Sequence, residues 1–165
     1  MLSAATRTSF AHSQVLAFLD PDGTIANFQH FLDLAKQLKL SITVCDVKIV
    51  DFAVLETLVE KLGKPIRGEI TPVLLLCGAN LDEQVSLAAH HMLATGYDVR
   101  LIRDLVFVGN HDLAHIHDLR LVHAGVIPIT LNQLVYEWAA MEVDLSCRSI
   151  LLKFRERLES ISRPA

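Results

Sequence analysis

Several features that would assign the chain to a specialised class of protein are scarce or missing. Among its 165 residues are three cysteines, Cys45, Cys77 and Cys147, an odd number without close spacing. Such cysteines do not make a disulfide framework, and two of them stand in apolar, strand-like contexts, so we expect buried, reduced thiols. No apolar run approaches the roughly 18 residues that span a bilayer. Acidic residues outnumber basic ones, 19 to 15, so we expect neither a nucleic-acid nor a membrane partner.

What the chain does contain is typical of a compact globular protein. Hydrophobic residues make up 52% of it and charged residues 21%. This length suits a single domain over residues 1–165, with residues 1–12 as a flexible lead. The lead is rich in serine and threonine, and no acidic residue precedes Asp20, which resembles a short mitochondrial presequence. We favour a cytoplasmic protein with a frayed N-terminus and keep the mitochondrial location as the alternative.

The stretch around which the chain is organised runs from an apolar segment into a helix. Residues 73–77 are all apolar and are followed by Gly78, which predicts a strand buried on both faces of a parallel sheet. Asn80 and Glu83 have the spacing of a capping box, so the next helix is expected to begin there. Ligands of open α/β sheets bind where such strands end and helices begin. We therefore look for the chemistry of this chain at residues 78–84.

The remaining chain alternates strands with helices. Proline within residues 126–130 places that strand at a sheet edge, because proline cannot donate to a ladder. This alternation predicts an α/β fold in three layers, a doubly wound parallel sheet of about five to six strands flanked by helices. The other strands are expected at 15–19, 41–45 and 99–102, and the helices at 26–38, 52–62, 110–124, 131–140 and 145–160.

A gapless series of landmarks runs from Val73 to Trp138. They are the apolar strand ending at Gly78, the segment Gly96 to Val99 that opens a strand, Asp104 at its end, Gly125 after a helix, and Thr130 before the next helix. In this order and spacing the chain resembles the isochorismatase-like cysteine hydrolases. The resemblance implies a doubly wound fold, frequent homo-oligomers (dimers or larger) and a small-molecule ligand.

The resemblance also implies a catalytic set. In the family an aspartate ends the first strand, a lysine follows the second, and a cysteine begins the helix after the central strand. The helix N-terminus and the lysine lower the pKa of such a thiol, and the aspartate accepts its proton. Asp20 matches the aspartate, Lys48 stands in the interval of the lysine, and Gln84 occupies the position of the cysteine. Asn80 and Leu81 fall where the family shapes its pocket.

The leading interpretation is a degenerate family member without cysteine-hydrolase activity. Glutamine is not a nucleophile, and Cys77, seven residues before Gln84, lies within a predicted buried strand. The segment between Cys45 and Phe52 is also much shorter than in the family, which removes part of the pocket wall. Any remaining hydrolysis would use Asp20 as a base on water. No cofactor and no metal ion is expected for this interpretation.

An alternative begins at the first strand. The sequence from Leu16 to Thr24, LAFLDPDGT, resembles the first motif of haloacid dehalogenase-like phosphohydrolases. Asp20 would then be the nucleophile and Asp22 the general acid, with magnesium alongside. Later in the sequence, the segment Val106 to Asp112 only faintly resembles the second acidic motif of that family, because Asn110 stands where the metal-binding aspartate belongs. The residues Asp20 to Gly23 also make a good turn without any catalytic role. We therefore place this alternative second.

Two further features bear on the function of the chain. His111, His115 and His117 lie near Asp112 and Asp118, but they would not all share one helix face, so a polar helix surface is favoured over a metal site. The high hydrophobic content also fits an oligomeric binding or structural protein. We expect its contact surface at the edge strand of residues 126–130 and on the last two helices.

Overall fold

The computed structural model describes residues 12–19, 23–46, 48–78 and 80–162. Within them is a sheet of five strands in the order β2-β1-β3-β4-β5, and all neighbouring strands are parallel. The predicted doubly wound α/β fold is confirmed. The strands are β1 (Ser13–Phe18), β2 (Ser41–Cys45), β3 (Val73–Cys77), β4 (Asp98–Ile102) and β5 (Ile127–Ile129).

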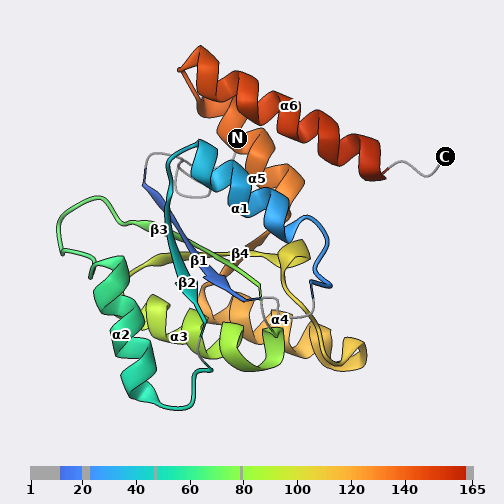
Figure 1. The fold of residues 1–165 in the computed structure, drawn as a ribbon. Helices are drawn as coiled ribbons and strands as arrows, with labels where there is room; N and C mark the ends of the chain where they lie inside the picture. The colour runs from blue at the N-terminus through green and yellow to red at the C-terminus, as the bar shows by residue number, and fades with distance from the viewer. Residues whose placement is uncertain (1–11, 20–22, 47, 79, 163–165) are drawn as a thin grey trace.

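Helices cover both faces of this sheet (Figure 1). Side chains of α1, α5 and α6 form one apolar core with it, and side chains of α2, α3 and α4 form the other. The α-helices are α1 (Phe28–Gln37), α2 (Phe52–Leu62), α3 (Ser86–Thr95), α4 (His111–Ala124), α5 (Leu131–Met141) and α6 (Leu145–Ser162). A π-helical turn, η2 (Leu81–Val85), precedes α3, and a 3-10 turn, η3 (Arg103–Leu105), follows β4.

The central strand β3 contributes to both cores. All five of its residues are buried, as its unbroken apolar sequence predicts. Successive side chains point to opposite faces of a strand. Leu74 and Leu76 therefore pack with α2, α3 and α4, whereas Val73, Leu75 and Cys77 pack with α1, α5 and α6.

The predicted helix ends agree with the structure where local signals are strong. The side chain of Asn110 accepts a hydrogen bond from the Asp112 amide, 3.0 Å away, and caps α4. Gly125 ends that helix with a φ of 109°. The proline-containing strand β5 lies at the sheet edge, as predicted. Among the described residues, none of the helices has the length and hydrophobicity that crossing a bilayer requires.

A buried charge lies inside the sheet. Arg100, in β4, is 1% exposed, and its Nη2 donates to Asp98 Oδ2 at 2.8 Å. Asp98 precedes it by two residues and so lies on the same face of the strand. A second pair, Arg103 with Asp118, is about one third exposed. The two pairs differ mainly in how far water can screen them.

Replacing Arg100 by alanine should therefore destabilise the protein strongly. We expect a loss of about 3 kcal/mol in unfolding free energy, because the change opens a cavity and leaves Asp98 without its partner. The matched control is Arg103→Ala, which should cost about 1 kcal/mol because its pair is solvated. Urea denaturation of both variants measures the difference, and equal losses would contradict this account.

Candidate functional site

The segments that follow β3 and β4 lie side by side at the carboxyl edge of the sheet. Gly78, directly after β3, donates its amide hydrogen to Leu105 O at 2.6 Å. Asn80 forms an isolated parallel bridge with Phe107, and Leu81 N donates to Phe107 O at 2.9 Å. The segment after β3 is thus bound along its backbone to the segment after β4. This edge is where open α/β sheets hold their ligands.

A shallow depression of about 320 Å³ opens at this edge. One wall comes from the segment between β1 and α1, and the other from the segment between β4 and α4. The lining residues are Thr24, Ile25, Ala26, Arg103, Asp104, Val106, Phe107, Val108 and His111. Sequence reasoning missed most of them as pocket residues. They could have been found from one rule, since the carboxyl ends of parallel strands meet at one sheet edge.

The predicted catalytic residues belong to three different segments of the chain. Asp20 and Asp22 lie outside the described residues, so their surroundings are not specified. Lys48 is exposed in the segment between β2 and α2. Gln84 lies half-buried in η2. Neither Lys48 nor Gln84 is among the residues that line the depression.

Asn80 and Leu81, the expected pocket residues, adjoin Gln84 but differ in burial. Leu81 is fully buried in the core, so only its backbone is available near the strand ends. Asn80 is half-buried, and its Oδ1 is buried with no hydrogen-bond partner among the described residues. A buried carbonyl of this kind is unfavourable unless a donor satisfies it. Asn80 is also not among the residues that line the depression.

The expected capping box at Asn80 is wrong. The Asn80 side chain makes no capping hydrogen bond, and the chain first winds into η2, where Val85 N donates to Asn80 O at 3.3 Å. Ser86 Oγ adds a 2.6 Å hydrogen bond to Leu81 O. The physical reason is that Phe107 holds Asn80 and Leu81 like a strand extension, which delays the first α-helical turn.

Several charged and polar groups around the depression are used for structure. Asp104 Oδ1 accepts from Leu131 N at 2.8 Å, and Thr130 Oγ1 accepts from Gln133 N at 3.2 Å, so both cap α5. Arg103 joins Asp118 through two hydrogen bonds of 2.7 and 3.2 Å. Asp118 is therefore paired and links α4 to the end of β4.

No thiol of the chain lies where a catalytic cysteine would act. Cys77 is 0% exposed within β3, and burial raises the pKa of its thiol far above the ordinary value of 9.0. Cys45 is buried at the end of β2. Partial burial, followed by the negative charges of Asp144 and Glu142, raises the pKa of Cys147 in α6. Protonated thiols are poor nucleophiles.

Metal-binding geometry is also not found in the part of the chain that the structure describes. No group of three or more His, Cys, Asp and Glu side chains is arranged there to hold an ion. His111 and His115 are exposed on α4, and His117 is half-buried. His117 thus lies on a different side of α4 from His111, as their spacing indicates.

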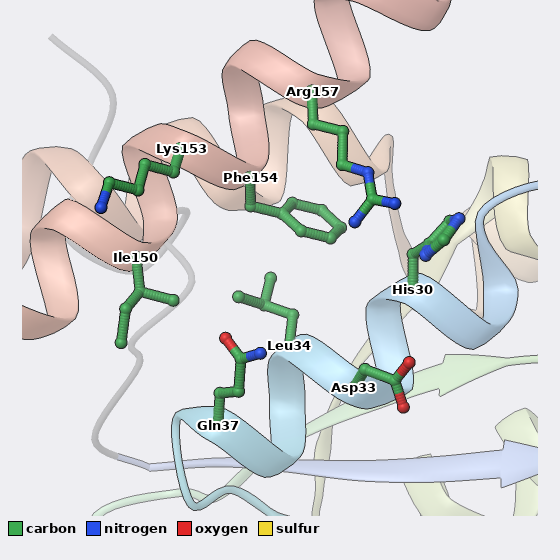
Figure 2. A pocket seen from close by; sticks show the side chains of 8 residues that line it. All are labelled: His30, Asp33, Leu34, Gln37, Ile150, Lys153, Phe154 and Arg157. Atoms are coloured by element: carbon green, nitrogen blue, oxygen red, sulfur yellow. The ribbon is translucent and has the colours of Figure 1, made fainter.

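A second depression, of about 340 Å³, lies between the outer surfaces of α1 and α6 (Figure 2). Leu34 and Phe154 point toward each other across it, and Lys153 and Arg157 project from the α6 side. Its remaining lining residues are His30, Asp33, Gln37 and Ile150. None of these residues follows a strand end, so this groove is not part of the candidate site.

Comparison with solved structures finds the same arrangement elsewhere. YcaC from Escherichia coli, described as an octameric hydrolase of unknown specificity, superposes with a TM-score of 0.66 at 16% identity over 94% of this chain and 96% of that one. YcaC from Pseudomonas aeruginosa, solved with hexane-2,5-diol and covalent acrylamide, gives 0.66 at 14% identity over 96% and 98%. The chain has the YcaC fold.

A third solved structure shares this fold. The MAR1 ribonuclease of Caenorhabditis elegans superposes on this chain with a TM-score of 0.68 at 13% identity, over 96% of this chain and 95% of that one. No protein-family model matches the sequence, and the search of curated proteins gave no match. The haloacid dehalogenase-like alternative receives no support from these comparisons.

Gly78 provides the first prediction at this site. Its φ is 82°, and a Cβ there would lie 2.0 Å from Phe18 O. Gly78→Ala should cost about 3 kcal/mol or more, because backbone atoms of β1 would have to move. Gly63→Ala is the matched control, with a φ of 84° and open space around the new Cβ. It should cost about 1 kcal/mol, and thermal or urea unfolding that found equal losses would rule out the steric explanation.

The buried Cys77 thiol provides the second prediction at this site. Its pKa is raised on folding, so its contribution to stability is complete below pH 9.0 and is lost as the pH rises, because only the unfolded chain releases the proton. Between pH 9.0 and 10.0 this loss should be about 1 kcal/mol, and at higher pH it approaches about 1.4 kcal/mol per pH unit. Urea unfolding of the wild type and Cys77→Ala measures it. Parallel pH profiles of the two proteins would contradict the prediction.

Proposed function

We propose that this chain is a pseudoenzyme of the isochorismatase-like fold, a homo-oligomer that binds a small molecule and does not hydrolyse substrates through a cysteine. One observation supports the proposal: by sequence resemblance Gln84 matches the position of the family's nucleophile, and each of the three cysteines lies elsewhere with a buried or partly buried thiol. An amide side chain has no lone pair basic enough to replace a thiolate.

The fold supports a hydrolase origin. The YcaC structures share it over nearly the whole chain, and E. coli YcaC is described as a hydrolase. The covalent acrylamide in the second YcaC structure also fits a nucleophilic group in that protein. In this chain Cys77 cannot replace such a group, because it lies within the sheet, seven residues before Gln84.

The remaining residues of the expected set are assigned to binding. Asp20 follows β1 in the sequence, and Gln84 and Asn80 belong to the segment that follows β3, so all three are proposed to face the same ligand. Asn80 Oδ1 favours a ligand with a hydrogen-bond donor. Leu81 supports this segment through its buried side chain. Of the proposed binding residues, Lys48 has the least support, because its side chain is exposed in the segment between β2 and α2.

Assembly is the second part of the proposal. E. coli YcaC is described as octameric, and this chain shares its fold. Many large apolar side chains of this chain also remain exposed. Burial of such surface between copies is a common reason for homo-oligomers. Buried, reduced thiols fit a reducing compartment such as the cytoplasm.

The experiment is a hydrolysis panel of amides, esters, phosphate esters and RNA, with and without magnesium. RNA is included because MAR1 is described as a ribonuclease. Wild type, Asp20→Ala and Gln84→Cys are compared, each with and without a thiol-blocking reagent. We expect no thiol-dependent turnover by the wild type. Acrylamide with mass spectrometry should find an adduct at position 84 in Gln84→Cys, at the start of the helical segment.

The outcomes separate the alternatives. Hydrolysis by the wild type that the thiol-blocking reagent abolishes would overturn the proposal. Magnesium-dependent phosphatase activity that is lost in Asp20→Ala would instead establish the phosphohydrolase alternative. No turnover, together with ligand-induced stabilisation that Gln84→Cys changes, would support a binding role.

A further inference from the structure

The groove between α1 and α6 has an apolar floor. Leu34 of α1 is buried, and Ile150 and Phe154 of α6 are half-buried beside it. All three pack in or against the core on that side of the sheet, so the floor is a fixed part of the structure. The groove holds about 340 Å³, which is within the range of small-molecule pockets. A ligand with an apolar body would remove this floor from water.

The two helices that form the walls run in opposite directions, so His30 near the start of α1 lies across from Arg157 late in α6 (Figure 2). The lining residues fall within positions 30–37 on one helix and 150–157 on the other. At about 1.5 Å per residue, each wall is about 10 Å long. An extended chain of about eight carbon atoms has nearly this length, because its C–C bonds of about 1.5 Å are staggered.

Two basic side chains meet at one end of the groove. The guanidinium of Arg157 and the ring of His30 point toward each other from opposite walls (Figure 2). Neither side chain has a hydrogen bond or an ion pair within the part of the chain that the structure describes. Lys153, four residues before Arg157, also has no such partner there. Like charges four residues apart on a helix repel each other, and a bound anion would relieve this repulsion.

Among the described residues that line the groove, Asp33 is the only acid. Its Oδ1 accepts a hydrogen bond from Gln29 Nε2 at 3.0 Å, so part of its hydrogen-bonding capacity is used along α1 itself. The other titratable lining residues are basic, and they are His30, Lys153 and Arg157. This excess of basic groups favours an anionic ligand over a cationic one.

We propose that this groove binds a free carboxylate with an apolar tail of about eight carbon atoms. The carboxylate lies between Arg157 and His30, because a guanidinium binds a carboxylate through two parallel hydrogen bonds. The tail lies over Leu34 and Phe154. A membrane lipid fits less well, because its chains span half of a hydrocarbon core of roughly 30 Å and exceed the groove. This site is separate from the strand ends and does not depend on the ligand proposed there.

The test is a titration of the full-length protein with octanoate, followed by saturation-transfer NMR because this method detects weak ligands. Two probes with the same tail, 1-octanol and octylammonium, report on the head group. Octanoate should bind about 10-fold more tightly than 1-octanol, because only its carboxylate is charged, and octylammonium should bind most weakly. Hexanoate should bind about 5-fold more weakly than octanoate, because two fewer methylene groups leave water.

Charge variants locate the site. Arg157→Gln should weaken octanoate binding by about 10-fold. Asp33→Asn should strengthen it by about 3-fold, because this change removes the one negative charge from the lining. The matched control is Arg148→Gln, which removes an exposed arginine of α6 that does not line the groove, and it should bind octanoate like the wild type. Circular dichroism and thermal unfolding verify that each variant is folded.

Several outcomes would overturn the carboxylate site. One is equal binding of octanoate and 1-octanol, and another is equal octanoate binding by Arg157→Gln and Arg148→Gln. If octanoate does not bind but phosphatidylglycerol vesicles do, the groove is a membrane-binding surface. A change of oligomer mass in Arg157→Gln, measured by sedimentation, would instead place the groove in a contact between copies of the chain. The expected order of probes, lost in Arg157→Gln and kept in Arg148→Gln, supports the site.

Discussion

The close approach of the chain to Phe18 as it leaves β3 is the constraint on which the rest of the structure depends. Gly78 must adopt a positive φ there, with its α-carbon so near Phe18 O that a methyl group would not fit. Its amide then binds Leu105, and Phe107 continues this pairing with Asn80 and Leu81. Three strand ends are thereby joined at one edge. The turn η2 and the start of α3 take their positions from this junction.

The framework around this junction does not depend on the side chain at position 84. The polar residues that surround the strand ends mostly stabilise the structure: Asp104 and Thr130 cap α5, and Arg103 holds α4 through Asp118. None of these bonds requires a thiol at position 84. In the proposed pseudoenzyme, glutamine at position 84 would therefore remove cysteine chemistry without disturbing this framework, because scaffold and activity can separate in a fold.

The distribution of apolar side chains gives the two helical layers different characters. On the α1, α5 and α6 side, a buried tryptophan and many leucines fill the space above the sheet. On the other side, α4 contributes one buried residue, Leu121, and exposes four large apolar ones. The exposed apolar residues of α4 are spread around half of the helix circumference, with exposed polar residues between them.

Patterns that act over a few residues could be interpreted from the sequence. The apolar run of β3, the edge position of the proline-containing strand β5, and the caps at Asn110 and Thr130 follow from local periodicity, a missing amide hydrogen and short side-chain hydrogen bonds. The buried state of Cys77 follows from the same run. These features together determine the α/β class and the position of the sheet edge that bears the candidate site.

Only the tertiary structure decided what happens at that edge and on the outer helices. Asp104 caps a helix 27 residues later in the chain, and Asn80 pairs with Phe107 in place of capping α3. Likewise, Leu113 and Ile116 have a spacing typical of a core face, yet they are exposed. The physical reason is the same in each case. Periodicity shows that a helix has an apolar side, whereas packing between distant segments decides which side is covered.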